Sequence, residues 1–327
     1  MTVGGDAELD ELDLEPRDAL TLFDRWERQS WTLADVDMAA DRDGWEGLSS
    51  FLAAELRRNV DRFFLGEVAV AQTLAPLAQC APEPTWQMYL CTQLADEARH
   101  ALFFVRYLEA VGARDAGVSL GDDVNERWEA TPAHFAELLD RQLRDVTERV
   151  WRSGGLACWY RAVTLYHLIV EGVLAVTGQR LMLDLVRDRP GLAALRAGML
   201  NIARDESRHI SFGVGALREG VRSGYGDAIA EQLHASVPLA VRIVLAPELA
   251  WPQLLPASVR RTMAVDVERR IARAGDALAA RVRRMGLDDV AADVRRAWAA
   301  AVRAGLDEYR ELHGRDHPLR TIEEARA

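Results

Sequence analysis

Two near-identical pentapeptides, DEARH at 96–100 and DESRH at 205–209, hold the pattern that decides the fold of this 327-residue chain. Each contains a Glu-x-x-His unit, Glu97 with His100 in the first and Glu206 with His209 in the second. Residues three apart lie on one face of a helix, so each unit places a carboxylate beside an imidazole. Such a pair is half of a metal site, although one unit alone is more typical of a solvated helix face.

Two further carboxylates lie in unusually apolar surroundings. Glu67 is the only charge in FFLGEVAVAQTL (63–74), and Glu171 is the only one in YHLIVEGVLAVTG (166–178). A carboxylate in such a run faces the interior, where an unpaired charge is costly. Each must therefore be paired with an arginine of a neighbouring helix, protonated, or bound to a cation.

Four helices then supply, in chain order, Glu, Glu-x-x-His, Glu and Glu-x-x-His, the ligand set of di-iron and di-manganese carboxylate bundles. This oxygen-rich set with two imidazoles suits Fe and Mn. The predicted ligands of one dinuclear site are Glu67, Glu97, His100, Glu171, Glu206 and His209. The remaining members of the pentapeptides fit around it: Asp96 and Asp205 as acceptors for the N–H of the histidine on the opposite helix, and Arg99 and Arg208 as their counter-ions. A solvated role for these four is equally open.

Composition excludes several other classes of protein. A net charge of −11 and a pI near 5.2 argue against a nucleic-acid surface, which needs concentrated Lys and Arg. Cys80, Cys91 and Cys158 are too few for a disulfide frame or a thiolate metal site, and a reduced cytoplasmic setting is the simplest. The acidic N-terminus lacks the apolar segment of a secretory signal, and no long uncharged apolar run predicts a membrane span.

Apolar residues recur at three- and four-residue spacing along most of the chain, which predicts an all-α protein. We expect helices at about 16–29, 47–80, 84–112, 131–152, 155–188, 191–222, 226–246, 257–284 and 287–313. Thr131 is expected as an N-cap with Pro132 at the first helical position, and Pro76 is expected to kink its helix or end it early. The predicted architecture is a single domain over 16–315 with a ferritin-like four-helix bundle core at about 47–222 and additional outer helices. The acidic segment 1–15 is expected to be a disordered tail, and 316–327 a second tail.

The chemistry that this site predicts is oxygen activation, not hydrolysis. A pair of reduced Fe or Mn ions supplies two electrons to O₂, and carboxylates follow the changing metal charge by shifting between bridging and terminal binding. Apolar surroundings keep water away from the oxidant that forms.

Five stretches between about 35 and 215 carry a more specific resemblance. They are DVDMAADRDGWEGLS, GEVAV, MYLCTQLADEARH, VTLYHLIVEGVLAVTG and DESRHISFG. They resemble the ribonucleotide reductase small-subunit-like ligand-binding oxidases of the ferritin-like superfamily. The resemblance implies one Mn and one Fe, although two Fe ions suit the same ligands, with a long-chain fatty acid bound in an apolar tunnel and a homodimeric protein. It places Glu67, Glu97 and His100 on the first metal and Glu171, Glu206 and His209 on the second.

The resemblance also implies an ether link between Val70 and Tyr166, formed during oxygen activation. Tyr166 precedes Glu171 by five residues, about 140° around an ideal α-helix, so a local distortion is needed to aim both side chains inward. The chain departs from the family at Gln179, which stands where an aromatic cluster is expected and implies a different ligand pocket or proton path. His167 does not fall where the family's histidine is expected, and we interpret it as a core or pocket-lining residue.

Three alternatives share this bundle. A ribonucleotide reductase small subunit normally has a radical Tyr one turn after its first histidine ligand, where this chain has Phe104, and usually an Asp where it has Glu67. A desaturase, hydroxylase or N-oxygenase uses the same ligand set and is not excluded by it. Ferritin-like iron storage is the non-enzyme alternative, although ferritin bundles are much shorter and leave the outer helices without a purpose.

Overall fold

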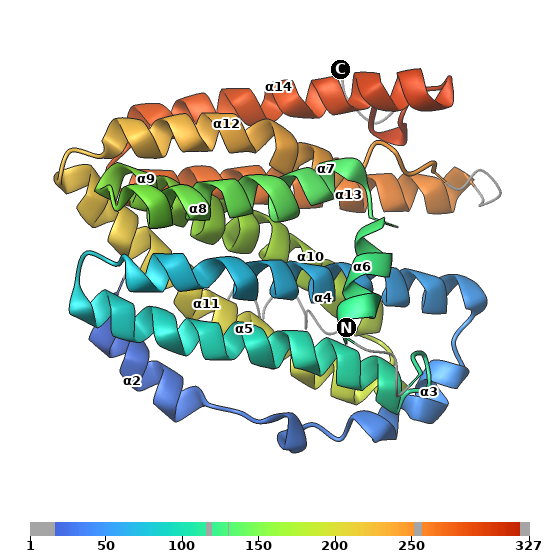
Figure 1. Ribbon diagram of the computed structural model, residues 1–327. Helices are drawn as coiled ribbons and strands as arrows, with labels where there is room; N and C mark the ends of the chain where they lie inside the picture. Colours follow the sequence, from blue (N-terminus) through green and yellow to red (C-terminus); the bar gives the residue numbers. More distant parts are fainter. Residues whose placement is uncertain (1–16, 116–119, 130, 252–256, 321–327) are drawn as a thin grey trace.

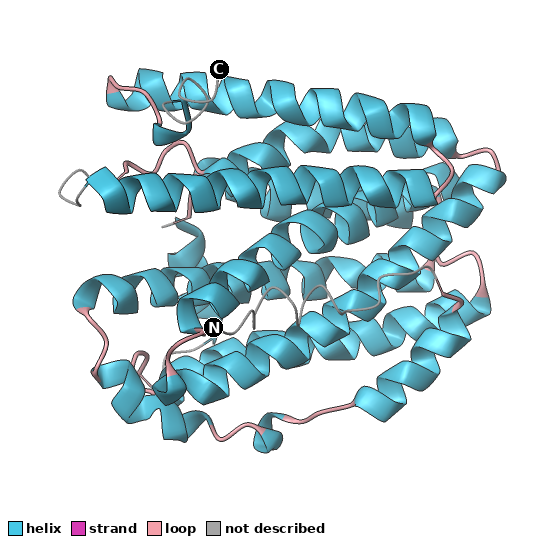
Figure 2. Cartoon of the chain, turned by 180° about the vertical axis from the view of Figure 1, so that it is seen from behind, coloured by secondary structure: helices cyan, strands magenta, loops and turns pink. Residues whose placement is uncertain are grey.

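The computed structural model describes residues 17–115, 120–129, 131–251 and 257–320, and this described part is helical without strands (Figures 1 and 2). The all-α prediction is therefore confirmed. The predicted acidic tail at 1–15 lies outside the described residues. The predicted tail at 316–327 is described only as far as Arg320, where residues 318–320 are helical.

The long helices match the predicted ranges closely. They are α2 (Ala19–Gln29), α4 (Ser50–Gln79), α5 (Pro84–Ala110), α11 (Ala193–Arg222), α12 (Gly226–Leu245), α13 (Ala257–Arg284) and α14 (Asp288–His313). Two composite helices contain π-helical turns: α7 (Ala133–Ala136), η3 (Glu137–Gln142) and α8 (Leu143–Ser153), then α9 (Leu156–Val163), η4 (Thr164–Ala175) and α10 (Val176–Val186). Short elements complete the chain: η1 (Leu33–Asp35), η2 (Met38–Asp41), α3 (Arg42–Glu46), α6 (Leu120–Glu129) and η5 (Pro190–Leu192).

The central bundle consists of α4, α5, α11 and the composite helix that contains η4. Helices α4 and α5 pack along each other, and α11 packs against η4 and α10. Helices α12, α13 and α14 cover the η4 side of this bundle, whereas α2 lies outside α5 and α11 (Figure 1). The bundle core with additional outer helices is thus the arrangement that the sequence predicted.

Local signals at helix ends explain most of the boundaries. Asp18 accepts a hydrogen bond from the Thr21 amide at the start of α2, and Ser49 accepts one from the Leu52 amide at the start of α4. Pro84 occupies the first turn of α5, where its missing N–H is not needed. Helix α4 passes through Pro76 and ends at Gln79, so this proline lies within the last turn of the helix.

Two predictions near residue 130 are wrong. The N-cap is Pro132, without a side-chain cap, and α7 begins at Ala133. The Thr131 hydroxyl instead donates to the Arg127 carbonyl, 2.7 Å away, and so completes the preceding turn. Helix α6 itself was not predicted, because its sequence LGDDVNERWE is too polar to show an apolar period.

The distortion predicted between Tyr166 and Glu171 is confirmed. Both residues lie in η4, whose i→i+5 hydrogen bonds bring residues five apart to the same side of the helix. Contacts from outside the helix support this segment: Arg281 Nη1 donates to the Gly172 carbonyl at 2.7 Å. Helix α11 approaches closely at Gly213, where an added Cβ would lie 2.2 Å from Cβ of His167.

One helix among the described residues, α12, is long and apolar enough to cross a membrane by length and composition. Such a helix is weak evidence for a span, because a core helix of a bundle has the same composition. Leu233, Val237 and Val241 of α12 are fully buried, and the helix packs against α14, η4 and α9. The packing of this buried face accounts for part of its apolar composition.

Candidate metal centre

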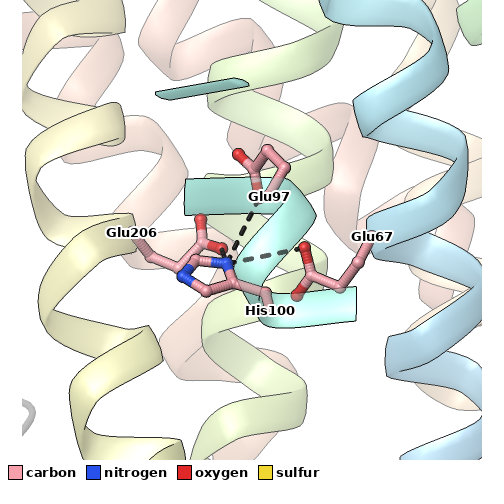
Figure 3. Close-up of side chains that lie close together, drawn as sticks. All are labelled: Glu67, Glu97, His100 and Glu206. Atoms are coloured by element: carbon pink, nitrogen blue, oxygen red, sulfur yellow. Dashed lines mark ion pairs between the residues drawn. The ribbon is translucent and has the colours of Figure 1, made fainter. Parts of the chain in front are cut away.

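The six predicted ligands come together in the middle of the bundle from four helices. Helix α4 supplies Glu67, α5 supplies Glu97 and His100, η4 supplies Glu171, and α11 supplies Glu206 and His209. None of the six is more than 6% exposed. Figure 3 shows the carboxylates of Glu67, Glu97 and Glu206 around the ring of His100.

The donor atoms form two overlapping groups. Those of Glu67, Glu97, His100 and Glu206 lie within 4.8 Å of one another, as do those of Glu97, Glu171 and His209. Nδ1 of His100 lies 3.3 Å from Oε2 of Glu97 and 3.7 Å from Oε1 of Glu206. Nδ1 of His209 lies 3.3 Å from Oε1 of Glu97 and 3.7 Å from Oε2 of Glu206. Glu97 and Glu206 thus offer one oxygen to each half, the arrangement of bridging carboxylates.

Several donor and acceptor atoms of these buried residues have no hydrogen-bond partner. They are Nδ1 of His100, Nδ1 of His209, and one Oε2 each of Glu97, Glu171 and Glu206. Leaving a buried acceptor unsatisfied is costly, and a charged one more so. Convergent lone pairs of imidazole and carboxylate are satisfied together by bound cations, so the residues present fit a pair of Fe or Mn ions.

The aspartates of the two pentapeptides lie where the sequence analysis expected them. Nε2 of His100 lies 3.1 Å from Asp205 Oδ2, and Nε2 of His209 lies 3.1 Å from Asp96 Oδ2, so each aspartate pairs with the histidine of the opposite helix. An Nε2–H donated to a carboxylate leaves the Nδ1 lone pair free to bind a metal.

Two buried or half-buried arginines bridge the same aspartates. Arg99 contacts both Asp96 and Asp205, and Arg208 does the same. Arg208 is 1% exposed, so its charge is compensated by these carboxylates and not by water. The two halves of the centre are therefore tied to each other through a buried ion network.

Three residues at the centre were not among the predicted site residues. The indole N–H of Trp31 donates to Asp205 at 2.7 Å, and that of Trp26 donates to Asp96 at 2.9 Å. Gln93 Nε2 donates to Oε1 of Glu171 at 2.7 Å. The tryptophans are far from their partners in sequence, whereas Gln93 had a usable signal, since it lies one helical turn before Glu97 on the same face.

The other predicted residues differ in their contacts with the centre. The Tyr166 hydroxyl donates to Oε1 of Glu97 at 3.0 Å, and Val70 belongs to the same buried apolar cluster as Tyr166. Phe104 stacks on Phe63 with ring centroids 5.3 Å apart. Nε2 of His167 lies 3.2 Å from Oε1 of Gln93, which connects His167 to the centre.

Gln179 is fully buried, and its Nε2 has no hydrogen-bond partner. Two surface pockets, of about 510 and 150 Å³, lie between α12 and α14 and beside α8 and α9. Neither of these two pockets is lined by a predicted site residue.

Comparisons with known proteins agree with this architecture. No family model matches the chain. A point mutant of an R2-like ligand-binding oxidase with aerobically reconstituted Mn/Fe cofactor is similar over 89% of this chain and 93% of that chain, with a TM-score of 0.62 and 20% identity. Two further mutants of such an oxidase give TM-scores of 0.61 and 0.62 over 94% and 97% of their own chains. The chain has the R2-like oxidase fold. At 20% identity this similarity establishes the fold alone.

Burial and mutual charge shift the pKa of every predicted ligand in this cluster. Burial raises the pKa of Glu67, Glu171 and Glu206, and neighbouring carboxylates raise it further. Burial also acts on Glu97, but the contacts with His209 and His100 outweigh it and hold the pKa of Glu97 well below its usual range. Burial lowers the pKa of His100 and His209, but the surrounding carboxylates raise it by more. The pKa of both histidines is therefore well above its usual value. Protons thus occupy the centre of the metal-free protein in place of cations.

Metal affinity is therefore expected to rise with pH. Groups whose folded pKa is raised, namely Glu67, Glu171, Glu206, His100 and His209, hold protons that a metal must displace. The same groups stabilise the metal-free fold below their unfolded pKa values, and this contribution is lost as pH rises through the folded values. Calorimetric metal titrations in two buffers of different ionisation enthalpy measure the released protons. Metal binding without proton release would contradict this expectation. So would a free energy of unfolding of the metal-free protein that increases with pH above 4.5.

Proposed function

We propose that the protein is a dinuclear Mn/Fe oxidase that uses O₂ for a two-electron oxidation inside the bundle. The observation that carries the proposal is the convergence of unpartnered Nδ1 and carboxylate oxygen atoms from four helices in a fully buried position. The solved structures of similar fold carry a Mn/Fe cofactor, which supports this metal pair over two Fe ions. When bound, the metal pair supplies electrons to O₂.

The protein groups have distinct parts in this proposal. Glu67, Glu97 and His100 hold the first ion, Glu171, Glu206 and His209 hold the second, and Glu97 and Glu206 extend to both. Asp96 and Asp205 keep the histidines in the Nε2–H form, and Arg99 and Arg208 balance their charge. Apolar side chains around the centre, including Phe104, exclude water from the oxidising species.

The proposal includes an ether cross-link between Val70 and Tyr166. A C–O bond forms between the Tyr166 oxygen and a side-chain carbon of Val70, while one C–H and the O–H bond break. The two electrons and two protons released go to O₂, whose complete reduction to two waters takes two more electrons from the metal pair and two more protons from solvent. The hydrogen bond from the Tyr166 hydroxyl to Glu97 supports this placement, because it holds the reacting oxygen beside a ligand shared by both ions.

We further propose a long-chain fatty acid as the bound ligand, a homodimer and a cytoplasmic location. The neighbours of similar fold are described as ligand-binding, which supports an organic ligand beside the centre. The three cysteines are free, which agrees with a reducing compartment. Gln179, whose buried amide nitrogen has no hydrogen-bond partner, is the residue we expect to adapt the ligand pocket of this chain.

The test is intact-mass analysis after loading metal-free protein with Fe and Mn in air. We expect a loss of two hydrogens, located to the peptides that hold Val70 and Tyr166. Anaerobically loaded protein and a Tyr166→Phe variant are the matched controls and should keep their full masses. Unlinked wild-type peptides with a full metal complement would favour a reductase-like, desaturase-like, hydroxylase-like or N-oxygenase-like protein, and a cage on size exclusion would favour iron storage.

A further inference from the structure

The two halves of the centre repeat the same residues but differ at one fully buried position. Gln93 lies four residues before Glu97, and Ile202 lies four residues before Glu206. The pentapeptides that follow, DEARH and DESRH, are otherwise equivalent in Asp, Glu, Arg and His. The pseudo-symmetry therefore has an amide on one side and an aliphatic side chain on the other.

The Gln93 amide crosses the bundle to the carboxylate of the opposite half. Its Nε2 donates to Oε1 of Glu171 at 2.7 Å, and its Oε1 lies 3.2 Å from Nε2 of His167. An ionised carboxylate, the form that binds a metal, only accepts hydrogen bonds, so in that form the amide nitrogen faces Glu171 and the amide oxygen accepts the Nε2–H of His167. The amide can make both bonds in this one orientation only.

His167 is itself held in place, which makes Gln93 a rigid donor. The imidazole ring of His167 packs against the rings of Tyr166 and Phe212, whose centroids lie 4.8 and 5.6 Å from its own. Gly213 of α11 lies directly against its Cβ, with no room for a side chain between them. Burial lowers the pKa of His167 to about 3, so the ring stays neutral and keeps one N–H to donate.

Gln93 holds the oxygen of Glu171 that faces His209, because Oε1 of Glu171 also lies 3.4 Å from Nδ1 of His209. The same Nε2 also donates to Oε1 of Glu97 at 3.4 Å, and this oxygen lies 3.3 Å from Nδ1 of His209. Among the described residues no side-chain amide reaches Glu67, whose Oε2 lies 3.7 Å from Nδ1 of His100. The two outer carboxylates therefore differ in whether an amide fixes the oxygen that faces the histidine.

We propose that Gln93, fixed by His167, is a positioning residue that makes the two metal sites unequal by holding the Glu171 oxygen that faces His209, whereas no such amide holds Glu67. This inference rests on the proposed dinuclear centre and explains how a nearly symmetric ligand set can distinguish two different metals. Sites that differ in ligand geometry differ in the divalent ion that they favour. Removing the amide should thus act on one ion and spare the other.

The experiment is an anaerobic titration of the metal-free, full-length protein with Mn(II) alone, followed by calorimetry and by the EPR signal of isolated Mn(II). For Gln93→Leu we expect the affinity of the Glu171–His209 site to fall by roughly 10- to 100-fold, the usual effect of losing an outer partner of a ligand, with the other site unchanged. The signal of isolated Mn(II) should then persist to higher metal concentration, because the second ion that couples to the first binds later. His167→Phe, which leaves the Gln93 donor but frees it, should produce a smaller loss at the same site.

Matched variants locate the effect. Ile202→Leu changes the pseudo-equivalent position without adding or removing an amide and should leave both affinities unchanged. In a His100→Ala background the Glu171–His209 site remains, and Gln93→Leu should weaken its affinity for metal. In a His209→Ala background the Glu67–His100 site remains, and Gln93→Leu should leave its affinity unchanged, because Gln93 and His209 act on the same site. Equal losses at both sites, or no loss in a folded Gln93→Leu protein, would overturn the inference and leave the dinuclear centre standing. Wild-type protein that binds fewer than two ions would overturn both.

Discussion

Glu97→Ala is expected to abolish tight binding of both metal ions, whereas Glu67→Ala and Glu171→Ala should each weaken one. Glu97 presents Oε2 to His100 and Oε1 to His209, 3.3 Å away in both cases, so its loss removes a ligand from each half at once. Losing even an outer partner of a ligand costs roughly 10- to 100-fold in affinity, so losing the shared ligand should cost at least the upper end of that range. Metal content after desalting, with titrations of the same samples, measures the difference.

The comparison needs a control for the helix itself. Glu109→Ala removes a partly exposed carboxylate from the same helix, where it pairs with Arg114, and should leave both affinities unchanged. Glu97→Gln keeps the volume of the side chain and should show the metal defect without loss of the fold. If Glu67→Ala or Glu171→Ala protein still holds both ions tightly, the two-site assignment is wrong and the oxidative function falls with it.

Much of this fold was open to prediction because helical periodicity is a local property. The long helices of the bundle follow from apolar spacing, and the breaks around Pro84 and Pro190 follow from backbone chemistry. The convergence of Glu67 and Glu171 on the Glu-x-x-His units was predictable for a different reason, namely that an isolated carboxylate in an apolar run must find a compensating partner. The structure brings these residues together, and their binding of metal stays a prediction.

What could not be predicted depends on contacts between distant segments. The i→i+5 turns of η4 were anticipated only because Tyr166 and Glu171 had to point the same way, whereas η3 had no such requirement and was missed. Trp26 and Trp31 reach their aspartates from segments far away in the sequence, so no spacing rule connects them. The surroundings of the buried Gln179 depend on side-chain packing, which composition and periodicity do not determine.

Asp205→Ala is expected to lower the free energy of unfolding of the metal-free protein by about 3–5 kcal/mol, the usual cost of removing one partner from a buried ion network. Asp205 is fully buried and is contacted by Trp31, Arg99, His100 and Arg208. Burial alone would raise its pKa, but these partners hold the pKa of Asp205 well below its usual range. Because the folded pKa is depressed, the contribution is present above the unfolded value, near 3.8, and is lost only as pH falls through the folded value. Chemical denaturation of metal-free protein at neutral pH measures it.

Asp293→Ala is the matched control, since Asp293 pairs with Arg296 on the surface, where both side chains are well exposed. An exposed ion pair contributes about 0–1 kcal/mol, so this variant should remain close to wild type. A metal titration separates stability from function: in Asp205→Ala protein His100 loses the acceptor that fixes its Nε2–H, and the affinity of its site should fall by roughly 10- to 100-fold. Equal stability of the two aspartate variants would mean that Arg99 and Arg208 find other partners or water. In that case the ion network does not hold the two halves of the centre together.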